Sequence, residues 1–125
     1  METTFKVIVA GGRDFNDYKL LTAKCDNYLI NKNNIEIVSG GAKGADSLAI
    51  KYANERGYNI KIFPPDWSTF GKRAGYLRNE QMSNYADALI AFWDGESRGT
   101  KHMIEIATDK GLLVRIIRYN KIFNF

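Results

Sequence analysis

The chain has 125 residues and a formal net charge of +4, and 45% of its residues are hydrophobic. This length suits one domain over residues 1–125, and no apolar run approaches the roughly 20 residues that cross a membrane. A single cysteine excludes an internal disulfide framework, so we expect a cytoplasmic protein without a membrane partner, and the small positive charge mildly favours anionic partners.

Apolar runs separated by glycine, proline and polar turns predict alternating strands and helices. FKVIVAGG at 5–12 predicts a strand buried on both faces, and apolar residues follow it at helical spacing over 17–31. IEIVS at 35–39 predicts a second strand, and the helix after it ends near Gly57.

The second half of the chain continues this alternation. YNIKIFPP at 58–65 predicts a third strand, and the loop DWSTFGKRAG leads into a helix from about Arg73 to Tyr85. DALIAFW at 87–93 and LLVRIIRY at 112–119 predict the fourth and fifth strands, with a helix between them. The final residues, NKIFNF, form a tail.

The alternation is typical of a parallel α/β sheet with helices on both faces, a three-layer Rossmann-like fold. We expect five strands in the order 3-2-1-4-5, which reverses between the first and fourth strands. Ligands of such sheets bind at that reversal, beyond the carboxyl ends of the strands. Three glycine-rich loops, GGRDF, SGGAKGAD and WDGESRGT, are expected to meet there.

Helix N-termini carry unpaired amides and a partial positive charge, and glycine lets an anion approach them closely. The turns at 40–44 and 95–100 each precede a helix, so we expect them to hold phosphate, aided by Lys43 and Thr100. A Walker loop is absent, and Ser39 stands where a GxGxxG fingerprint needs glycine. Tight turns without a ligand are the alternative explanation for each loop taken singly.

The segment GKRAGYLRNEQM places Gly75, Arg78 and Asn79 on one helical face. Apolar neighbours one turn away indicate a partly shielded Arg78 guanidinium, which favours a phosphate or carboxylate partner. A structural salt bridge to a nearby aspartate is the alternative role for this arginine.

Three loop aromatics, Phe15, Trp67 and Phe70, either stack on a base or pack over a sheet edge. Asp66 either binds a ribose hydroxyl or caps a turn after Pro65, and we favour the turn. No Cys/His cluster predicts a metal site, and no residue is assigned as catalytic or as binding a cofactor.

The candidate ligand-binding residues come from the glycine-rich loops, the loop before the Arg78 helix, and that helix. They are Gly11, Gly12, Arg13, Asp14, Phe15, Ser39, Gly40, Gly41, Ala42, Lys43, Gly44, Asp46, Trp67, Lys72, Gly75, Arg78, Asn79, Asp94, Gly95, Ser97, Gly99 and Thr100.

From Phe5 to about Gly111, the segments GGRDF, SGGAKGADSLAIKYA, DWSTFGKRAGYLRNEQM and ADALIAFWDGESRGT resemble the YspA/YpsA-related branch of the SLOG superfamily. The resemblance implies a Rossmann-like fold that binds nucleotides or nucleotide-derived ligands. Its better-known relatives are the Lonely Guy phosphoribohydrolases and the DNA-processing protein of natural transformation, and other members are predicted nucleotide sensors.

The enzymatic relatives carry a PGGxGTxxE motif, in which glutamate follows threonine by three residues. Here Met103 holds that position after Thr100, and Glu105 lies about 200° away around the helix. Asp14, Asp46 and Asp94 are the remaining acids for hydrolysis. His102, on the polar side of its helix, is expected to be inert. Enzymatic activity is therefore uncertain, and we lean against it.

Three functions follow from these observations. The first is a sensor or sequestering protein that binds a nucleotide-like small molecule at the carboxyl edge of the sheet. The second is a nucleotide N-glycosidase-like hydrolase. The third is DNA binding, which we rank last because the cations do not form a dense run, so nucleic acid is expected to be an unlikely partner. A homodimer or higher homo-oligomer is plausible.

Overall fold

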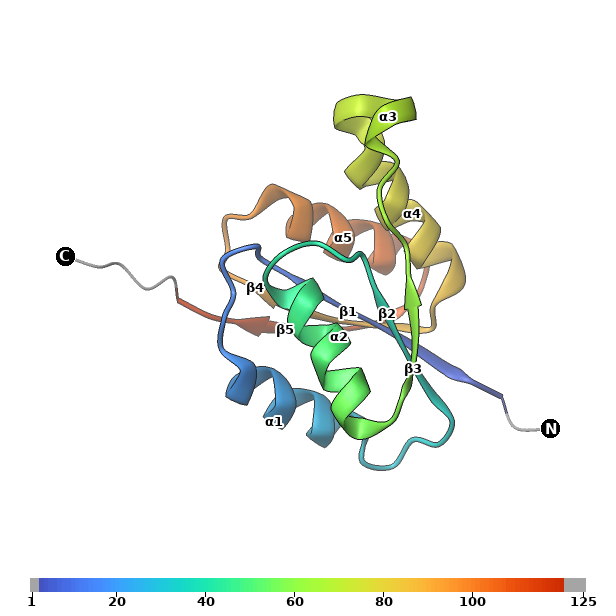
Figure 1. Cartoon of the computed structure of the whole chain (residues 1–125), viewed down its shortest axis with the longest axis vertical. Helices are drawn as coiled ribbons and strands as arrows, with labels where there is room; N and C mark the ends of the chain where they lie inside the picture. The colour runs from blue at the N-terminus through green and yellow to red at the C-terminus, as the bar shows by residue number, and fades with distance from the viewer. Residues whose placement is uncertain (1–2, 121–125) are drawn as a thin grey trace.

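The computed structural model describes residues 3–120, which form one five-stranded parallel sheet. The strand order is β3-β2-β1-β4-β5, as the sequence predicts (Figure 1). The strands are β1 (Phe5–Gly11), β2 (Ile35–Ser39), β3 (Asn59–Ile62), β4 (Ala88–Trp93) and β5 (Leu113–Arg118).

Four long helices cover the two faces of the sheet and complete a three-layer fold (Figure 1). Helices α1 and α2 pack on one face, and α4 and α5 pack on the other. The helices are α1 (Tyr18–Leu29), α2 (Ala45–Arg56), α4 (Ala74–Tyr85) and α5 (Arg98–Asp109).

The central strand β1 is apolar on both faces because helices cover both. Val7 and Val9 belong to the core beneath α1 and α2, whereas Ile8 packs toward α4 and α5. Cys25 lies in the first of these cores, as the sequence predicts, and burial raises the pKa of its thiol to about 12. This cysteine is therefore a core residue.

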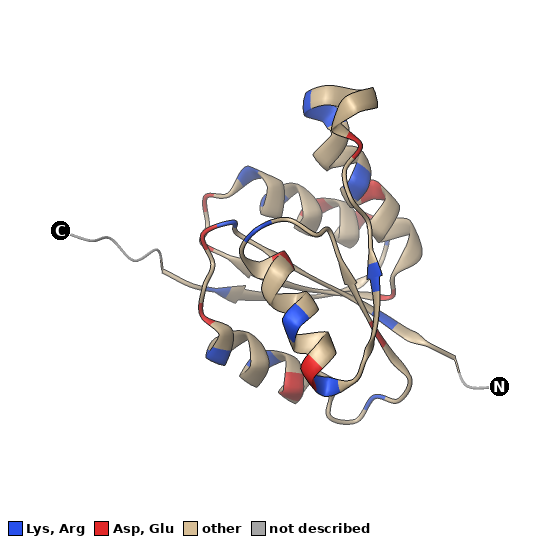
Figure 2. Cartoon of the chain, in the orientation of Figure 1, with Lys and Arg blue, Asp and Glu red and all other residues tan. Residues whose placement is uncertain are grey.

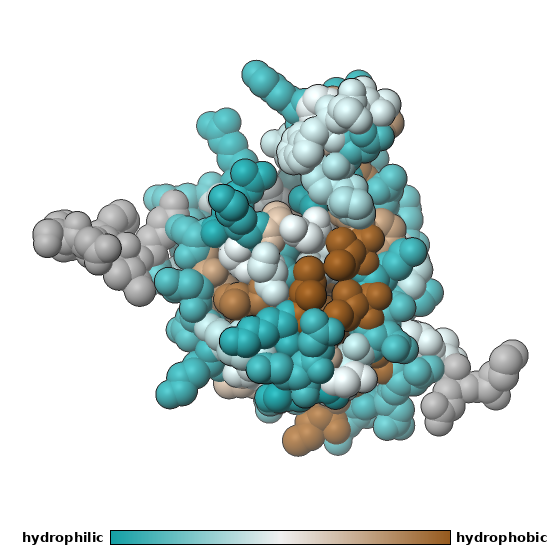
Figure 3. All heavy atoms as spheres, in the orientation of Figure 1, coloured by the Kyte–Doolittle hydropathy of each residue, from teal (hydrophilic) through white to brown (hydrophobic). Residues whose placement is uncertain are grey.

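The two edge strands are more exposed than the centre of the sheet. Figure 3 shows hydrophobic side chains gathered between α2 and β3, where Ile62 is exposed. Helix α2 packs mainly on β1 and β2, which leaves this part of β3 uncovered.

The loop predicted at 66–75 contains two short helical turns, and this differs from the sequence prediction. They are α3 (Trp67–Phe70) and a 3-10 turn, η1 (Gly71–Arg73), which together we call the arm. Asp66 caps α3 by accepting a hydrogen bond from the Thr69 amide at 3.1 Å, so its predicted turn-capping role is confirmed. The arm projects from the body of the molecule beyond α4 (Figure 1).

Within residues 3–120, every helix is too short or too polar to cross a membrane. Of the predicted tail NKIFNF, only Asn120 belongs to the described residues.

Candidate functional site

A cavity of about 540 Å³ opens at the carboxyl edge of the sheet. Its floor is formed by Ala10 and Gly11 at the end of β1, with Met82 from α4 and Met103 from α5. The volume lies in the range of roughly 300–1,000 Å³ that is usual for small-ligand sites. The cavity lies beside β1 and β4, where the strand order reverses, which is the place that the fold predicts.

The structure brings most of the candidate residues to the wall of this cavity. Those that line it are Gly11, Gly12, Arg13, Asp14, Ala42, Asp46, Trp67, Lys72, Gly75, Arg78, Asn79, Asp94, Ser97, Gly99 and Thr100. Those that do not line it are Phe15, Ser39, Gly40, Gly41, Lys43, Gly44 and Gly95.

Two amides of the double-glycine turn before α2 are bonded within their own loop, which corrects the expectation that they face an anion. The Gly41 amide donates to Ser39 Oγ at 3.1 Å, and the Ala42 amide donates to Asp46 Oδ2 at 3.2 Å. A Cβ atom on Gly44, whose φ is +77°, would overlap the carbonyl oxygen of Gly12. Glycine is needed here because two loops touch through their backbones.

The N-terminus of α5 opens onto the cavity. Asp94 Oδ1 accepts hydrogen bonds from the Glu96 and Ser97 amides, both at 2.8 Å, and so shapes the turn before the helix. Ser97 is the N-cap residue but makes no side-chain capping bond. Gly99 and Thr100, in the first turn, line the cavity, so α5 supplies the unpaired amides and positive dipole that attract an anion.

Arg78 is half-buried, as its apolar neighbours predict. Its Nη1 donates to the Gly40 carbonyl at 2.7 Å and its Nε donates to Asn79 Oδ1 at 3.1 Å. Burial lowers the pKa of the guanidinium, while the nearby Asp46 carboxylate opposes that shift. The alternative of a salt bridge is not realised, because the ion pairs among residues 3–120 are Arg56–Asp26 and Lys101–Glu105.

Two other acids of the cavity wall, Asp46 and Asp14, interact with neighbouring protein groups. Asp46 is buried, and that burial raises the pKa of its carboxyl group. Asp14 accepts a hydrogen bond from the Tyr119 hydroxyl at 2.7 Å. Tyr119 also packs against Phe15 with ring centroids 4.8 Å apart. Phe15 is therefore a buried core residue, although the sequence analysis included it among the ligand-binding candidates.

Tyr76 and three floor residues, Ala10, Met82 and Met103, line the cavity although the sequence did not single them out as ligand residues. Tyr76 directly follows Gly75, but the helical-face argument selected only the Arg78 face. Its ring packs on the His102 ring with centroids 4.5 Å apart.

His102 is partly buried, which differs from the exposed position that its polar helix face predicts. Asn79 Nδ2 lies 3.1 Å from its Nδ1, and Tyr76 of α4 covers its ring. Met103, which occupies the glutamate position of the hydrolase motif, lines the cavity. Glu105 is exposed and pairs with Lys101 at 3.8 Å.

Six cations that are scattered in the sequence belong to segments that follow the carboxyl ends of strands. Arg13, Lys72 and Arg78 line the cavity, and Lys43, Arg73 and Arg98 are sequence neighbours of residues that line it. Figure 2 shows lysine and arginine positions along this edge and on the arm. We call this set the cationic rim: Arg13, Lys43, Lys72, Arg73, Arg78 and Arg98. Three acids at the same edge accept hydrogen bonds from the protein: Asp66 and Asp94 from amides of their own turns, and Asp14 from the Tyr119 hydroxyl.

Two solved structures share this fold. DNA processing protein A from Streptococcus pneumoniae is 22% identical, with a TM-score of 0.71 over 94% of this chain and 51% of that one. DNA processing protein A from Helicobacter pylori is 23% identical, with a TM-score of 0.63 over 90% of this chain and 64% of that one. This chain therefore spans between half and two thirds of these proteins.

The H. pylori structure is described as showing a single-stranded DNA binding mode. The expectation that nucleic acid is an unlikely partner is therefore wrong, because a protein with this fold binds single-stranded DNA. The argument from sequence failed because it considered cations along the chain, whereas the fold brings them to one edge.

A sequence relative of similar length is the Gene 61 protein of Mycobacterium phage D29. It is 34% identical over 116 residues, which cover 87% of this chain and 93% of that protein. Residues 5–70 match the YspA, cpYpsA-related SLOG family. By both the family match and this relative, the chain belongs to the YspA, cpYpsA-related SLOG family.

Proposed function

We propose that this protein binds single-stranded DNA at the carboxyl edge of its sheet. The observation that carries the proposal is the cationic rim around a cavity, on a fold shared with a protein described as binding single-stranded DNA. Phosphates dominate the affinity of proteins for nucleic acid, and they are neutralised by lysine and arginine side chains.

The rim and the cavity have separate tasks in this proposal. Exposed cations such as Arg13 and Arg98 follow the sugar–phosphate backbone across the edge. The half-buried Arg78 and the first turn of α5 bind a phosphate that enters the cavity. An unpaired strand suits this arrangement because its bases are free to leave the stack, whereas bases within a duplex are held in it.

A second candidate is a free nucleotide or nucleotide-derived ligand. The observation that favours it is the cavity volume of about 540 Å³, which is in the range of small-molecule sites. In this case the same anion-binding groups hold the phosphate, and the exposed rim cations contribute little.

Fluorescence anisotropy of a labelled oligothymidylate of about 20 nucleotides tests the first proposal. We expect saturable binding, weaker binding of the matching duplex, and little competition by nucleoside monophosphates. Strong competition by a mononucleotide favours the second candidate, and the absence of oligonucleotide binding contradicts the first.

Two variants on one helix provide a matched comparison. Arg98 begins α5 at the rim, and Lys110 follows the other end of the same helix. Arg98→Ala should weaken oligonucleotide binding by about fivefold, since an exposed charge contact contributes up to about 1 kcal/mol. Lys110→Ala should leave binding unchanged, and an equal loss in both variants would argue against binding at the rim.

A further inference from the structure

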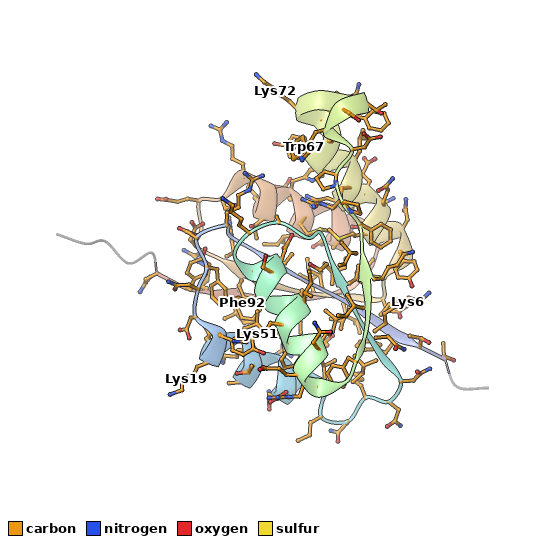
Figure 4. The ribbon with its side chains drawn as sticks, viewed as in Figure 1. Lys6, Lys19, Lys51, Trp67, Lys72 and Phe92 are labelled. Atoms are coloured by element: carbon orange, nitrogen blue, oxygen red, sulfur yellow. The ribbon has the colours of Figure 1, made fainter. Side chains whose placement is uncertain are left out.

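Two aromatic side chains form one wall of the cavity without being buried by the protein. Trp67 is 51% exposed and Tyr76 is 47% exposed, and both line the cavity. Figure 4 shows Trp67 turned from the arm back toward the body of the molecule, while Lys72 points away. Large aromatic rings that remain in water beside a cavity retain apolar surface for a ligand to cover.

The backbone beside the indole carries no side chain at Gly75. A Cβ atom on Gly75 would lie 3.8 Å from Cη2 of Trp67, its nearest neighbour outside the adjoining residues. The indole therefore lies over a helix start that carries no side chain at this position. No residue of α3 or η1 is buried, so the indole of Trp67 is not needed to form a core within the arm.

The ring of Tyr76 packs against a neighbouring side chain, and this contact restricts the orientation of the second ring of the wall. Its ring meets the His102 ring at 4.5 Å with an interplanar angle of 57°. Asn79 in turn contacts His102 Nδ1 at 3.1 Å. A ring braced in this way loses little freedom when a ligand stacks on its open side.

We infer that Trp67 and Tyr76 form a stacking subsite for an unpaired nucleobase, an inference that rests on the proposed binding of single-stranded DNA. The phosphate of the same nucleotide lies toward Arg78 and the start of α5, on the basic part of the same cavity. Base–aromatic stacking tolerates every base because each has a π-face. The subsite therefore recognises that a base is unpaired, with little preference for its identity.

Phe70 provides a matched control on the arm itself. It belongs to α3 like Trp67 and is 46% exposed, yet it does not line the cavity. Trp67→Ala should weaken binding of an oligothymidylate by about 5- to 150-fold, the range found when a stacking ring is removed. Phe70→Ala should change the affinity less than about twofold. Equal losses in the two variants would overturn the subsite.

An oligonucleotide whose sugar–phosphate backbone lacks bases separates stacking from phosphate binding. Wild type and Trp67→Ala should bind it with the same affinity, because there is no base left to stack. If Trp67→Ala weakens abasic and normal oligonucleotides by the same factor, the side chain acts on the backbone or on the fold, and the inference is wrong.

Tryptophan fluorescence supplies a direct readout of contact. Oligothymidylate should quench the emission of the wild type over the same concentrations at which anisotropy of labelled DNA rises. Trp67→Phe should still bind, since phenylalanine also stacks, but should lose most of this quenching, so that only a small change from the second tryptophan, Trp93, remains. Binding with undiminished quenching in Trp67→Phe overturns the subsite alone. No binding by the wild type overturns the proposed function and the subsite together.

Discussion

Gly40 lies between a guanidinium and a buried carboxyl group, and neither leaves room for a side chain. A Cβ atom there would overlap Nη1 of Arg78 and lie 2.8 Å from Oδ2 of Asp46. Nη1 of Arg78 also donates a hydrogen bond of 2.7 Å to the carbonyl oxygen of Gly40. The glycine therefore sets the position of the arginine, although it does not line the cavity itself.

Gly40→Ala should displace the end of the flexible Arg78 side chain while the protein still folds. We expect oligonucleotide affinity to fall about tenfold or more, because hydrogen bonds to charged groups contribute about 1.5–3 kcal/mol. In an Arg78→Ala background the same substitution should cost little further affinity, since the guanidinium is absent. Anisotropy titration of the four proteins measures this coupling, and simple additivity would show that Gly40 acts independently of Arg78.

Asp46 should give stability a pH dependence of unusual sign for an acid. Burial raises the pKa of this carboxyl group in the folded protein above its ordinary value. Between the unfolded and folded pKa values the native state binds more protons, so the free energy of unfolding falls as pH rises through that window. Each unit of pKa difference corresponds to about 1.4 kcal/mol.

Asp46→Asn removes this ionisation while keeping an oxygen to accept from the Ala42 amide. Urea unfolding at several values between about pH 4 and pH 7 should show the variant gaining stability relative to the wild type as pH rises. All other titrating groups are common to both proteins, so the difference isolates Asp46. A difference that does not change with pH would contradict the raised pKa.

At the scale of elements, the arm is among the least buried segments of the fold. Like the edge strands β3 and β5 it has no buried residue, whereas β1 and β4 bury most of their residues. Segments with few apolar contacts open at low free energy. The arm also carries one ring of the proposed stacking subsite and two rim cations, so a bound strand should hold it in place.

Hydrogen exchange followed by mass spectrometry should therefore report binding at the arm. Amides of residues 67–73 should exchange much faster than those of β1 and β4 in the free protein and should slow when oligothymidylate is added. Peptides from α1, on the opposite face of the sheet from α4, serve as the internal control. An arm that exchanges at the same rate with and without the oligonucleotide would argue against its participation.

The strands and long helices could be predicted from the sequence because each is long enough to show the spacing of apolar residues that is typical of a strand or a helix. Four residues cannot show a helical period, and so α3 was predicted as part of a loop. The sequence also indicates that several glycine-rich turns meet at one edge, but it does not show which amides are already bonded. Ser39 and Asp46 accept bonds from amides of their own turn, although Asp46 also lines the cavity as predicted, and α5 provides the open amides.

At the scale of the whole molecule, the distribution of positive charge is the feature that the sequence predicted least well. The six rim cations lie as far apart in sequence as Arg13 and Arg98, so no basic run marks them. Parallel strands place the segments after them at one edge, and the cations gather there (Figure 2). A modest net charge of +4 therefore conceals a local concentration of positive side chains.

The salt dependence of oligothymidylate binding tests the role of this edge most directly. Each phosphate neutralised on a single strand contributes about −0.7 to the slope of log affinity against log salt concentration. Three to six rim contacts therefore predict a slope between about −2 and −4 for the wild type. Arg13→Ala combined with Arg98→Ala should reduce its magnitude by about 1.4, whereas Lys32→Ala combined with Lys110→Ala, at the opposite edge, should leave it unchanged. A flat salt response, or the same reduction in both double variants, would contradict DNA binding at the cationic rim.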